Sequence, residues 1–343
     1  MNRQLIALVA ILATVGAAIY YLLVQSNNQV ATRALLFPNL TQQAANIDFI
    51  EVTQPSGRVF NATKKASDWI TALDEVGVDY PMEQARLAEL VENLATAILF
   101  EAKTTKPENY EHLGLQDITQ ADSQATEVSI RAGGSQYRIL IGANASSGQG
   151  SYVRLTDESQ TWLLNKVIDL PSNQYDWLKQ PILNIDVSQV DSMVRIGDGG
   201  FSIIKSSGGE YQFQLTNLSS AQSLKYDSIV DGFVTNLMAL DFEKILGVDS
   251  ATWQELPVVA GFQISLSDGT VIEASLRQEQ HLNYIMFTAL GGQGGDYWDG
   301  LVYQISSFNA GQIGRTLADF VEQTKGIDAS QTMSTDEGES PSN

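Results

Sequence analysis

The longest apolar run in the chain lies close to its N-terminus. Leu5 to Val24 is a run of twenty residues without a charge, and a helix rising about 1.5 Å per residue over this length spans the roughly 30 Å hydrocarbon core of a bilayer. We therefore predict a transmembrane anchor over residues 4–24, and one crossing only, because no later stretch is comparably apolar. The alternative is a cleaved signal peptide, whose apolar region is usually shorter, about 7–15 residues.

The charges beside the anchor indicate its orientation. Arg3 precedes the apolar run, whereas residues 25–32 carry no charge, so the positive-inside rule places residues 1–3 in the cytoplasm. In a bacterial cell, the bulk of the chain then lies in the periplasm, held at the inner membrane by residues 5–24. Small residues at near-helical spacing would let another transmembrane helix approach closely; they are Ala10, Ala13, Gly16 and Ala17.

Polar segments follow the anchor and end the chain. Residues 25–45 are rich in Gln, Asn, Ala and Thr, and we predict that they form a tether. Residues 326–343 carry four acidic side chains and no basic one, which is typical of a disordered tail.

Between tether and tail, residues 46–185 and 186–325 repeat one order of elements. Short apolar runs separated by turn residues predict antiparallel strands, and one apolar run at helical spacing interrupts them in each half. The helical runs cover residues 87–99 and 229–240 and extend to Phe100-Glu101 and Phe242-Glu243. The predicted strands cover residues 49–52, 58–60, 128–130, 137–141, 152–154 and 162–164 in the first half, and 193–196, 201–204, 211–213, 262–266, 271–276, 284–287 and 301–305 in the second.

The pattern predicts an α+β fold in which a transmembrane helix precedes two similar domains, each a mainly antiparallel sheet with one long amphipathic helix packed on it. Aligning the Phe-Glu pairs that end the helical runs gives an offset of 142 residues, which places Val52 on Val194. The clearest hairpin joins residues 262–266 to 271–276 through Asp268-Gly269, a pair that suits a type I′ turn. Two unrelated α+β domains remain the alternative to a repeat.

Composition narrows the possible functions. The 343 residues include no cysteine and carry 40 acidic against 20 basic side chains, a formal net charge of -20. Disulfide scaffolds, thiol enzymes and cysteine-ligated metal sites are excluded because the sulfur is absent. Nucleic acid is not an expected partner, since the chain offers no cluster of Lys and Arg to replace phosphate counterions.

Catalytic and cofactor motifs do not emerge from the sequence. The two histidines, His112 and His281, accompany no G-x-S-x-G nucleophile elbow, and the chain contains no G-x-x-x-x-G-K-S/T phosphate loop and no G-x-G-x-x-G between a strand and a helix. We therefore predict no catalytic, cofactor-binding or metal residues, no cofactor and no enzymatic activity.

A set of short motifs resembles a known family. They are Pro107-Glu108-Asn109-Tyr110, Leu113-Gly114-Leu115, Ile139-Leu140-Ile141-Gly142, Gly150-Ser151-Tyr152-Val153-Arg154, Trp162-Leu163, Asp169-Leu170-Pro171 and Asp176-Trp177-Leu178. In this order they resemble the bacterial domain-of-unknown-function 4340 family. The resemblance implies a membrane-anchored envelope protein, found beside an ABC-type exporter permease, its ATPase and an auxiliary subunit of the gliding-motility type. It implies structural roles for the matched residues, with Gly142 and Pro171 as turn formers and Tyr110 and Trp177 as packing anchors.

Three functions remain after this reading. The leading hypothesis is a non-enzymatic accessory subunit of an ABC-type exporter, with a periplasmic body that contacts a partner subunit or the exported substrate. The second is a stand-alone periplasmic module that binds glycan or peptide through aromatic residues and glycine-rich loops. The third is a carboxylate hydrolase of envelope polymers, for which the sequence singles out no particular acid.

Overall fold

The structure, a computed structural model, describes residues 34–322 apart from 209, 211, 221, 248–249 and 291–296. The predicted anchor, its small residues Ala10, Ala13, Gly16 and Ala17, and the predicted acidic tail lie outside these residues. Within them, no helix is both long and apolar enough to cross a membrane. The chain forms two compact units divided between Lys179 and Gln180, where the sequence placed the boundary between residues 185 and 186. We call them the first and second units.

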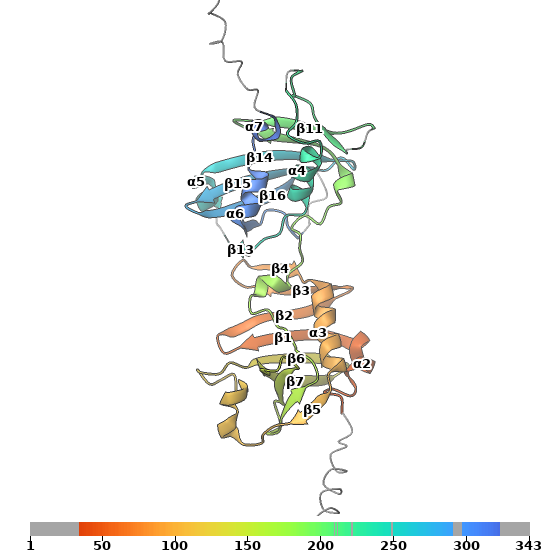
Figure 1. The fold of residues 1–343 in the computed structure, drawn as a ribbon, viewed down its shortest axis with the longest axis vertical. Helices are drawn as coiled ribbons and strands as arrows, with labels where there is room; N and C mark the ends of the chain where they lie inside the picture. The colour runs from red at the N-terminus through yellow and green to blue at the C-terminus, as the bar shows by residue number, and fades with distance from the viewer. Residues whose placement is uncertain are drawn as a thin grey trace, which may run out of the picture. The chain divides into compact units, whose positions relative to one another are not determined.

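The first unit is a nine-stranded antiparallel sheet with few helices (Figure 1). Its strands are β1 (Ile47–Gln54), β2 (Gly57–Lys65), β3 (Asp68–Leu73), β4 (Val78–Pro81), β5 (Leu99–Ala102), β6 (Thr126–Ala132), β7 (Ser135–Asn144), β8 (Ser151–Leu155) and β9 (Thr161–Leu164). They lie in the order β4-β3-β2-β1-β6-β7-β8-β9-β5. Its helices are α2 (Leu40–Gln43), α3 (Gln84–Thr96) and the short 3-10 helices η1 (Ala44–Asn46), η2 (Pro107–Asn109), η3 (Glu111–Leu113) and η4 (Gln174–Trp177).

The second unit is an eight-stranded antiparallel sheet. Its strands are β10 (Val190–Ile196), β11 (Phe201–Lys205), β12 (Phe213–Leu215), β13 (Lys244–Leu246), β14 (Val258–Leu266), β15 (Val271–Glu279), β16 (Leu282–Leu290) and β17 (Val302–Ile305). They lie in the order β12-β11-β10-β14-β15-β16-β17-β13. Its helices are η5 (Val187–Gln189), α4 (Ile229–Met238), α5 (Ser250–Glu255), α6 (Ser307–Ile313) and α7 (Leu317–Phe320).

One helix covers one face of each sheet, as the apolar spacing predicts. Helix α3 buries Leu87, Leu90 and Leu94, which recur on a single face of a 3.6-residue period. In the second unit, the Phe233 ring of α4 lies 5.2 Å from the Phe201 ring of β11 and 5.9 Å from the Phe262 ring of β14. We call the sheet face beneath these helices the inner face.

Both helices end earlier than predicted. Helix α3 stops at Thr96 because Ala97 has an extended backbone (φ -63, ψ 140), and the N–H of Leu99 donates to the carbonyl of Ala34 at 2.9 Å. Residues 99–102 then pair with β9 as strand β5. Backbone pairing with a distant segment therefore outweighs the helical spacing that continues through this stretch.

The predicted tether, residues 25–45, extends too far along the chain. Leu36, Phe37 and Leu40 are buried at 3 %, 6 % and 0 % exposure, and the Phe37 ring meets Tyr137 edge-on at 5.3 Å. Residues 34–45 therefore belong to the core of the first unit, and their apolar cluster is the sequence signal for it.

The two units share one topology. When β4 is set aside, the strand orders of the two sheets correspond one for one along the chain, with α3 and α4 at the same place. The burial pattern of β1 from Ile47 repeats in β10 from Val190, and each strand shifts register at this point in its pairing with β6 or β14. The offset is 143 residues, so Val52 corresponds to Arg195 and not to Val194.

Two smaller expectations need correction. The hairpin of β14 and β15 forms as predicted, but Asp268 has no positive φ; only Gly269 does, at 89°, so the turn is not type I′. Instead, Leu266 pairs with Thr270 around a three-residue loop. Gly142 is not in a turn but within β7, where a Cβ would lie 2.3 Å from the carbonyl oxygen of Leu113.

Candidate functional site: a pocket in the second unit

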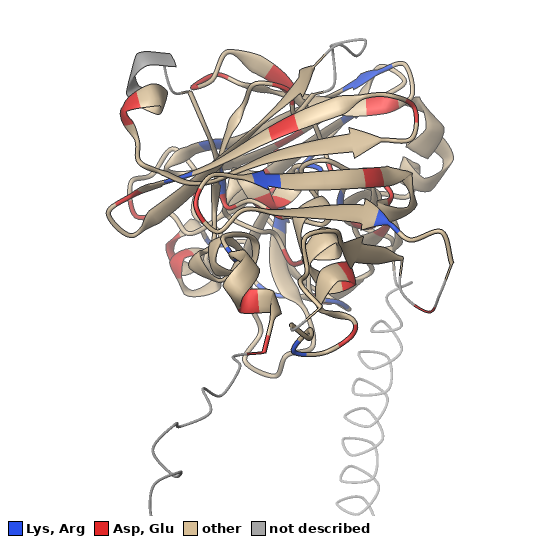
Figure 2. Cartoon of the chain, turned by 90° about the horizontal axis from the view of Figure 1, so that it is seen from above, with Lys and Arg blue, Asp and Glu red and all other residues tan. Residues whose placement is uncertain are grey.

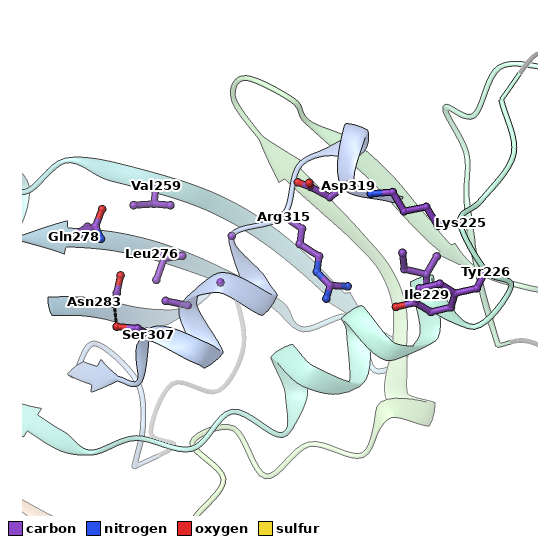
Figure 3. A pocket seen from close by; sticks show the side chains of 13 residues that line it. Lys225, Tyr226, Ile229, Val259, Leu276, Gln278, Asn283, Ser307, Arg315 and Asp319 are labelled. Atoms are coloured by element: carbon purple, nitrogen blue, oxygen red, sulfur yellow. Dashed lines mark hydrogen bonds between the residues drawn. The ribbon is translucent and has the colours of Figure 1, made fainter. Parts of the chain in front are cut away.

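An open pocket of about 630 Å³ lies on the inner face of the second sheet, where helices α4, α6 and α7 leave part of the face uncovered (Figure 3). A volume of this size falls in the range of small-ligand sites, about 300–1,000 Å³. Its lining is amide-rich at one end, apolar in the middle and charged at the other end.

The amide end continues the inner face of the sheet. Leu276 is buried at 1 % exposure and points inward, so Gln278, two residues further along β15, takes the same face. On the neighbouring strand, Asn283 pairs with Gln278 in the ladder and is itself only 6 % exposed. The Asn283 amide donates to Ser307 Oγ of α6 at 3.4 Å. The sequence signal for this end is an amide at the position where the alternation predicts an apolar residue.

The middle of the pocket is apolar and kept open by small residues. Val259 and Leu276 line it from the sheet. From α6 and the turn after it come Ala310, Gly311 and Gly314. A Cβ added at Gly311 would meet no atom within 4 Å, so this side of α6 faces free space.

The charged end is built where the chain enters α4 and α7. Lys225 precedes α4 and its N–H donates to the carbonyl of Phe320 at 2.9 Å, which holds the two segments together. Thr316 caps α7, and its N–H and hydroxyl donate to the Asp319 carboxylate at 2.8 and 3.0 Å. These hydrogen bonds, with the charges of Lys225 and Arg315, lower the pKa of Asp319. Figure 3 shows Lys225, Arg315 and Asp319 together at this end.

A buried arginine lies behind the pocket wall. Arg195 is 6 % exposed, and its guanidinium donates to the carbonyl oxygens of Asp198 at 2.5 Å and Val259 at 3.2 Å. Burial lowers the pKa of Arg195, against the charges of Asp319 and Asp198. Among the described residues, Arg195 Nε has no hydrogen-bond partner. An ionised side chain with incomplete bonding is costly in a core, which singles out this position.

Ion pairs are distributed unevenly between the units. Figure 2 shows acidic side chains on strands, helices and loops alike. All five ion pairs of the described residues lie in the first unit, for example Arg138 with Glu127 at 2.8 Å. The cations at the pocket therefore have no carboxylate within ion-pair distance in the part of the chain that the structure describes.

Comparison with known proteins identifies the family. Residues 76–256, more than half of the chain, match the domain of unknown function DUF4340. The chain belongs to the DUF4340 family. No curated protein and no solved structure matches it. The matched range reaches from the end of the first unit into the second and includes Arg195 and Lys225.

The motif residues that resemble this family serve packing in the DUF4340 chain. Tyr110 donates its hydroxyl to the Ser159 carbonyl at 2.6 Å, and the Arg154 guanidinium lies 4.8 Å from its ring centroid. Trp177 is 1 % exposed, packs on Phe60 with centroids 4.6 Å apart and donates Nε1 to the Pro171 carbonyl at 3.0 Å. These residues fix the first unit and do not line the pocket.

Other residues weighed in the sequence are placed apart from the pocket. His112 and His281 are both exposed. Three of the five tryptophans, Trp177, Trp253 and Trp298, are buried at 5 % exposure or less, which leaves Trp69 and Trp162 as partly exposed rings. Among the described residues, no three metal-ligating side chains come together.

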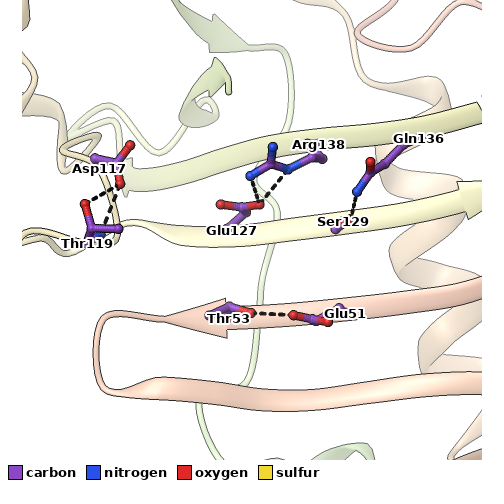
Figure 4. Close-up of polar contacts among 8 residues, drawn as sticks. All are labelled: Glu51, Thr53, Asp117, Thr119, Glu127, Ser129, Gln136 and Arg138. Atoms are coloured by element: carbon purple, nitrogen blue, oxygen red, sulfur yellow. Dashed lines mark hydrogen bonds and ion pairs between the residues drawn. The ribbon is translucent and has the colours of Figure 1, made fainter. Parts of the chain in front are cut away.

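The outer face of the first sheet is polar but internally satisfied (Figure 4). Arg138 donates Nε and Nη2 to the Glu127 carboxylate at 2.9 and 2.8 Å, and Gln136 donates to Ser129 at 3.1 Å. In the loop before β6, Asp117 accepts from the hydroxyl and the N–H of Thr119, and these bonds lower the pKa of Asp117. This face offers few unbonded groups to a ligand.

Proposed function

We propose that the protein is a non-enzymatic, single-pass envelope subunit that works with an ABC-type exporter of the gliding-motility class. Its partners would be the permease, the ATPase and the auxiliary subunit, and residues 5–24 would anchor it in the inner membrane with the described units in the periplasm. The family resemblance supports the setting, and the uncharged run from Leu5 to Val24 supports the anchor.

Exposed apolar side chains around the pocket carry the proposal of a protein partner. Tyr226 lines the pocket and is 53 % exposed, Val258 on β14 is 59 % exposed, and Phe308 on α6 is 73 % exposed. Large apolar groups gathered on the elements of one site are typical of interaction surfaces. An accessory subunit would use such a surface to contact the permease or the auxiliary subunit.

Affinity purification of the full-length protein from its native membrane in mild detergent, with in-cell crosslinking, tests the proposal. We expect permease and ATPase in stoichiometric amounts, and crosslinks that map to residues around Phe308. Phe308→Ser should weaken recovery, whereas Val167→Ser, an exposed apolar residue of the first unit, should not. Recovery of the protein alone, under conditions that preserve a known transporter complex, would refute the accessory role.

The predicted helix contact in the membrane has its own test. Gly16→Leu and Ala17→Leu enlarge the face of small residues and should reduce co-purification by blocking close helix approach. Unchanged co-purification would exclude this contact without affecting the periplasmic surface.

A second function, a periplasmic binding module, is favoured by the pocket itself. An open cavity with amides, apolar walls and charged groups is the usual composition of a ligand site. This function predicts saturable ligand binding by the purified full-length protein without any membrane partner.

A further inference from the structure

The internal repeat shows which side chains distinguish the pocket from its counterpart in the first unit. The N–H of Glu83 donates to the carbonyl of Trp177, as the N–H of Lys225 donates to that of Phe320. Glu83 therefore corresponds to Lys225, and Trp177 to Phe320 at the offset of 143 residues. The bridges Met82–Leu178 and Leu224–Val321 beside them agree with this alignment.

The same offset aligns the remaining charged residues. Asn173 caps η4 and Thr316 caps α7, so the residues before the caps, Ser172 and Arg315, correspond. Arg195 corresponds to Val52, as the shared burial pattern of β10 and β1 shows.

Three cations therefore stand in the second unit where the first has other residues. Lys225 replaces an acid, Arg315 replaces a serine and Arg195 replaces a buried valine. In a chain with twice as many acids as bases, these cations nevertheless have no ion-pair partner among the described residues. Unneutralised cations that line one end of a pocket favour an anionic group in that place.

The body of the ligand follows from the rest of the lining. Gln278 and Asn283 each offer a donor and an acceptor, which matches the alternating carbonyl and N–H groups of a peptide. Val259 and Leu276 lie between the amides and the cations (Figure 3) and suit an apolar side chain. At the charged end, Lys225, Arg315 and Asp319 sum to one positive charge, which a single carboxylate balances and a doubly charged phosphate exceeds.

We propose that this pocket binds the C-terminal end of a short extended peptide, with the terminal carboxylate at Lys225 and Arg315 and the preceding peptide groups at Gln278 and Asn283. The assignment rests on the second function proposed above, a binding module, and names its ligand class. It is independent of association with a transporter.

Two matched peptide pools test the assignment. Randomised N-acetylated tetrapeptides, one pool with free C-terminal carboxylates and the other with C-terminal amides, are passed over immobilised full-length protein, and retained peptides are identified by mass spectrometry. The carboxylate pool should be retained at least about tenfold better, because hydrogen bonds to charged groups are the strong ones. Lys225→Gln with Arg315→Gln should abolish the preference, and Lys205→Gln, a cation of β11 outside the pocket, should preserve it.

Each other outcome overturns the assignment. Equal retention of the two pools, or a preference that survives Lys225→Gln with Arg315→Gln, would show that the carboxylate is not read at this site. Retention of neither pool, with stabilisation by inorganic phosphate that these two substitutions remove, would identify a phosphate site instead. Circular dichroism of the double variant separates loss of binding from loss of folding. Failure of peptide binding leaves the co-purification of permease and ATPase unaffected, so the two proposals are distinguished.

Discussion

Phe320 provides a direct test of how the second unit is held together. The side chain is fully buried, and its ring lies 4.8 Å from Phe201 of β11 and 5.3 Å from Phe233 of α4. A buried aromatic side chain removes about 150–250 Å² from water, and truncation of such a residue to alanine costs about 3–5 kcal/mol. Two ring contacts are lost as well, so we expect Phe320→Ala to fall in the upper half of this range.

Urea unfolding of the full-length protein, followed by hydrogen exchange on peptides from each unit, measures this effect. Protection should be lost from peptides of α4, β11 and α7. Phe308→Ala is the matched control, since this phenylalanine is 73 % exposed and its truncation should change the free energy of unfolding by less than about 0.5 kcal/mol. If Phe320→Ala costs no more than the control, α7 does not close the core of the second unit and the alignment of Phe320 with Trp177 loses its physical meaning.

Three further predictions concern backbone space and pH. Gly150→Ala should destabilise the first unit by more than about 2 kcal/mol in thermal unfolding, because its Cβ would lie 2.0 Å from the carbonyl oxygen of Leu164. Gly232→Ala, within α4 and with no atom within 4 Å of its Cβ, should instead stabilise by about 0.5–1 kcal/mol in the same assay. The pKa of Asp319 is lowered from 3.8, so its ionised form contributes stability above that pH and loses it as the pH falls further. Asp319→Asn should therefore lose less stability between pH 5 and pH 3 (about two pH units around this carboxyl) than the unsubstituted protein, and equal losses would contradict the role of the cap.

The sheet-and-helix organisation could be predicted because each element carries its own period. Strands β14 and β15 alternate buried and exposed positions from Phe262 to Leu266 and again from Ile272 onward, and an Asp-Gly turn separates them. The ends of α3 could not be predicted from spacing, since Leu99 continues the apolar pattern but pairs with residue 34 instead. Long-range pairing leaves no local mark on such a residue.

The alignment of the two halves failed by one residue for a physical reason. Matching like with like placed Val52 on Val194, but Val194 is 38 % exposed while Val52 is fully buried. Because side chains alternate across a strand, an error of one residue exchanges the two faces of the sheet. The true counterpart, Arg195, is an unlike residue at the same buried position, so residue similarity concealed the substitution that matters most.

The pocket escaped sequence reasoning for the same reason. Gln278, Lys225 and Arg315 each read as surface residues when taken singly, and only the fold brings them to one cavity. Their meaning comes from the duplicate, which holds an acid at 83 and a serine at 172 and so supplies an internal reference for what the architecture requires. A buried charge adds no evident stability over an apolar side chain of similar volume, so the arginine at the position of Val52 is best explained by what the second unit binds.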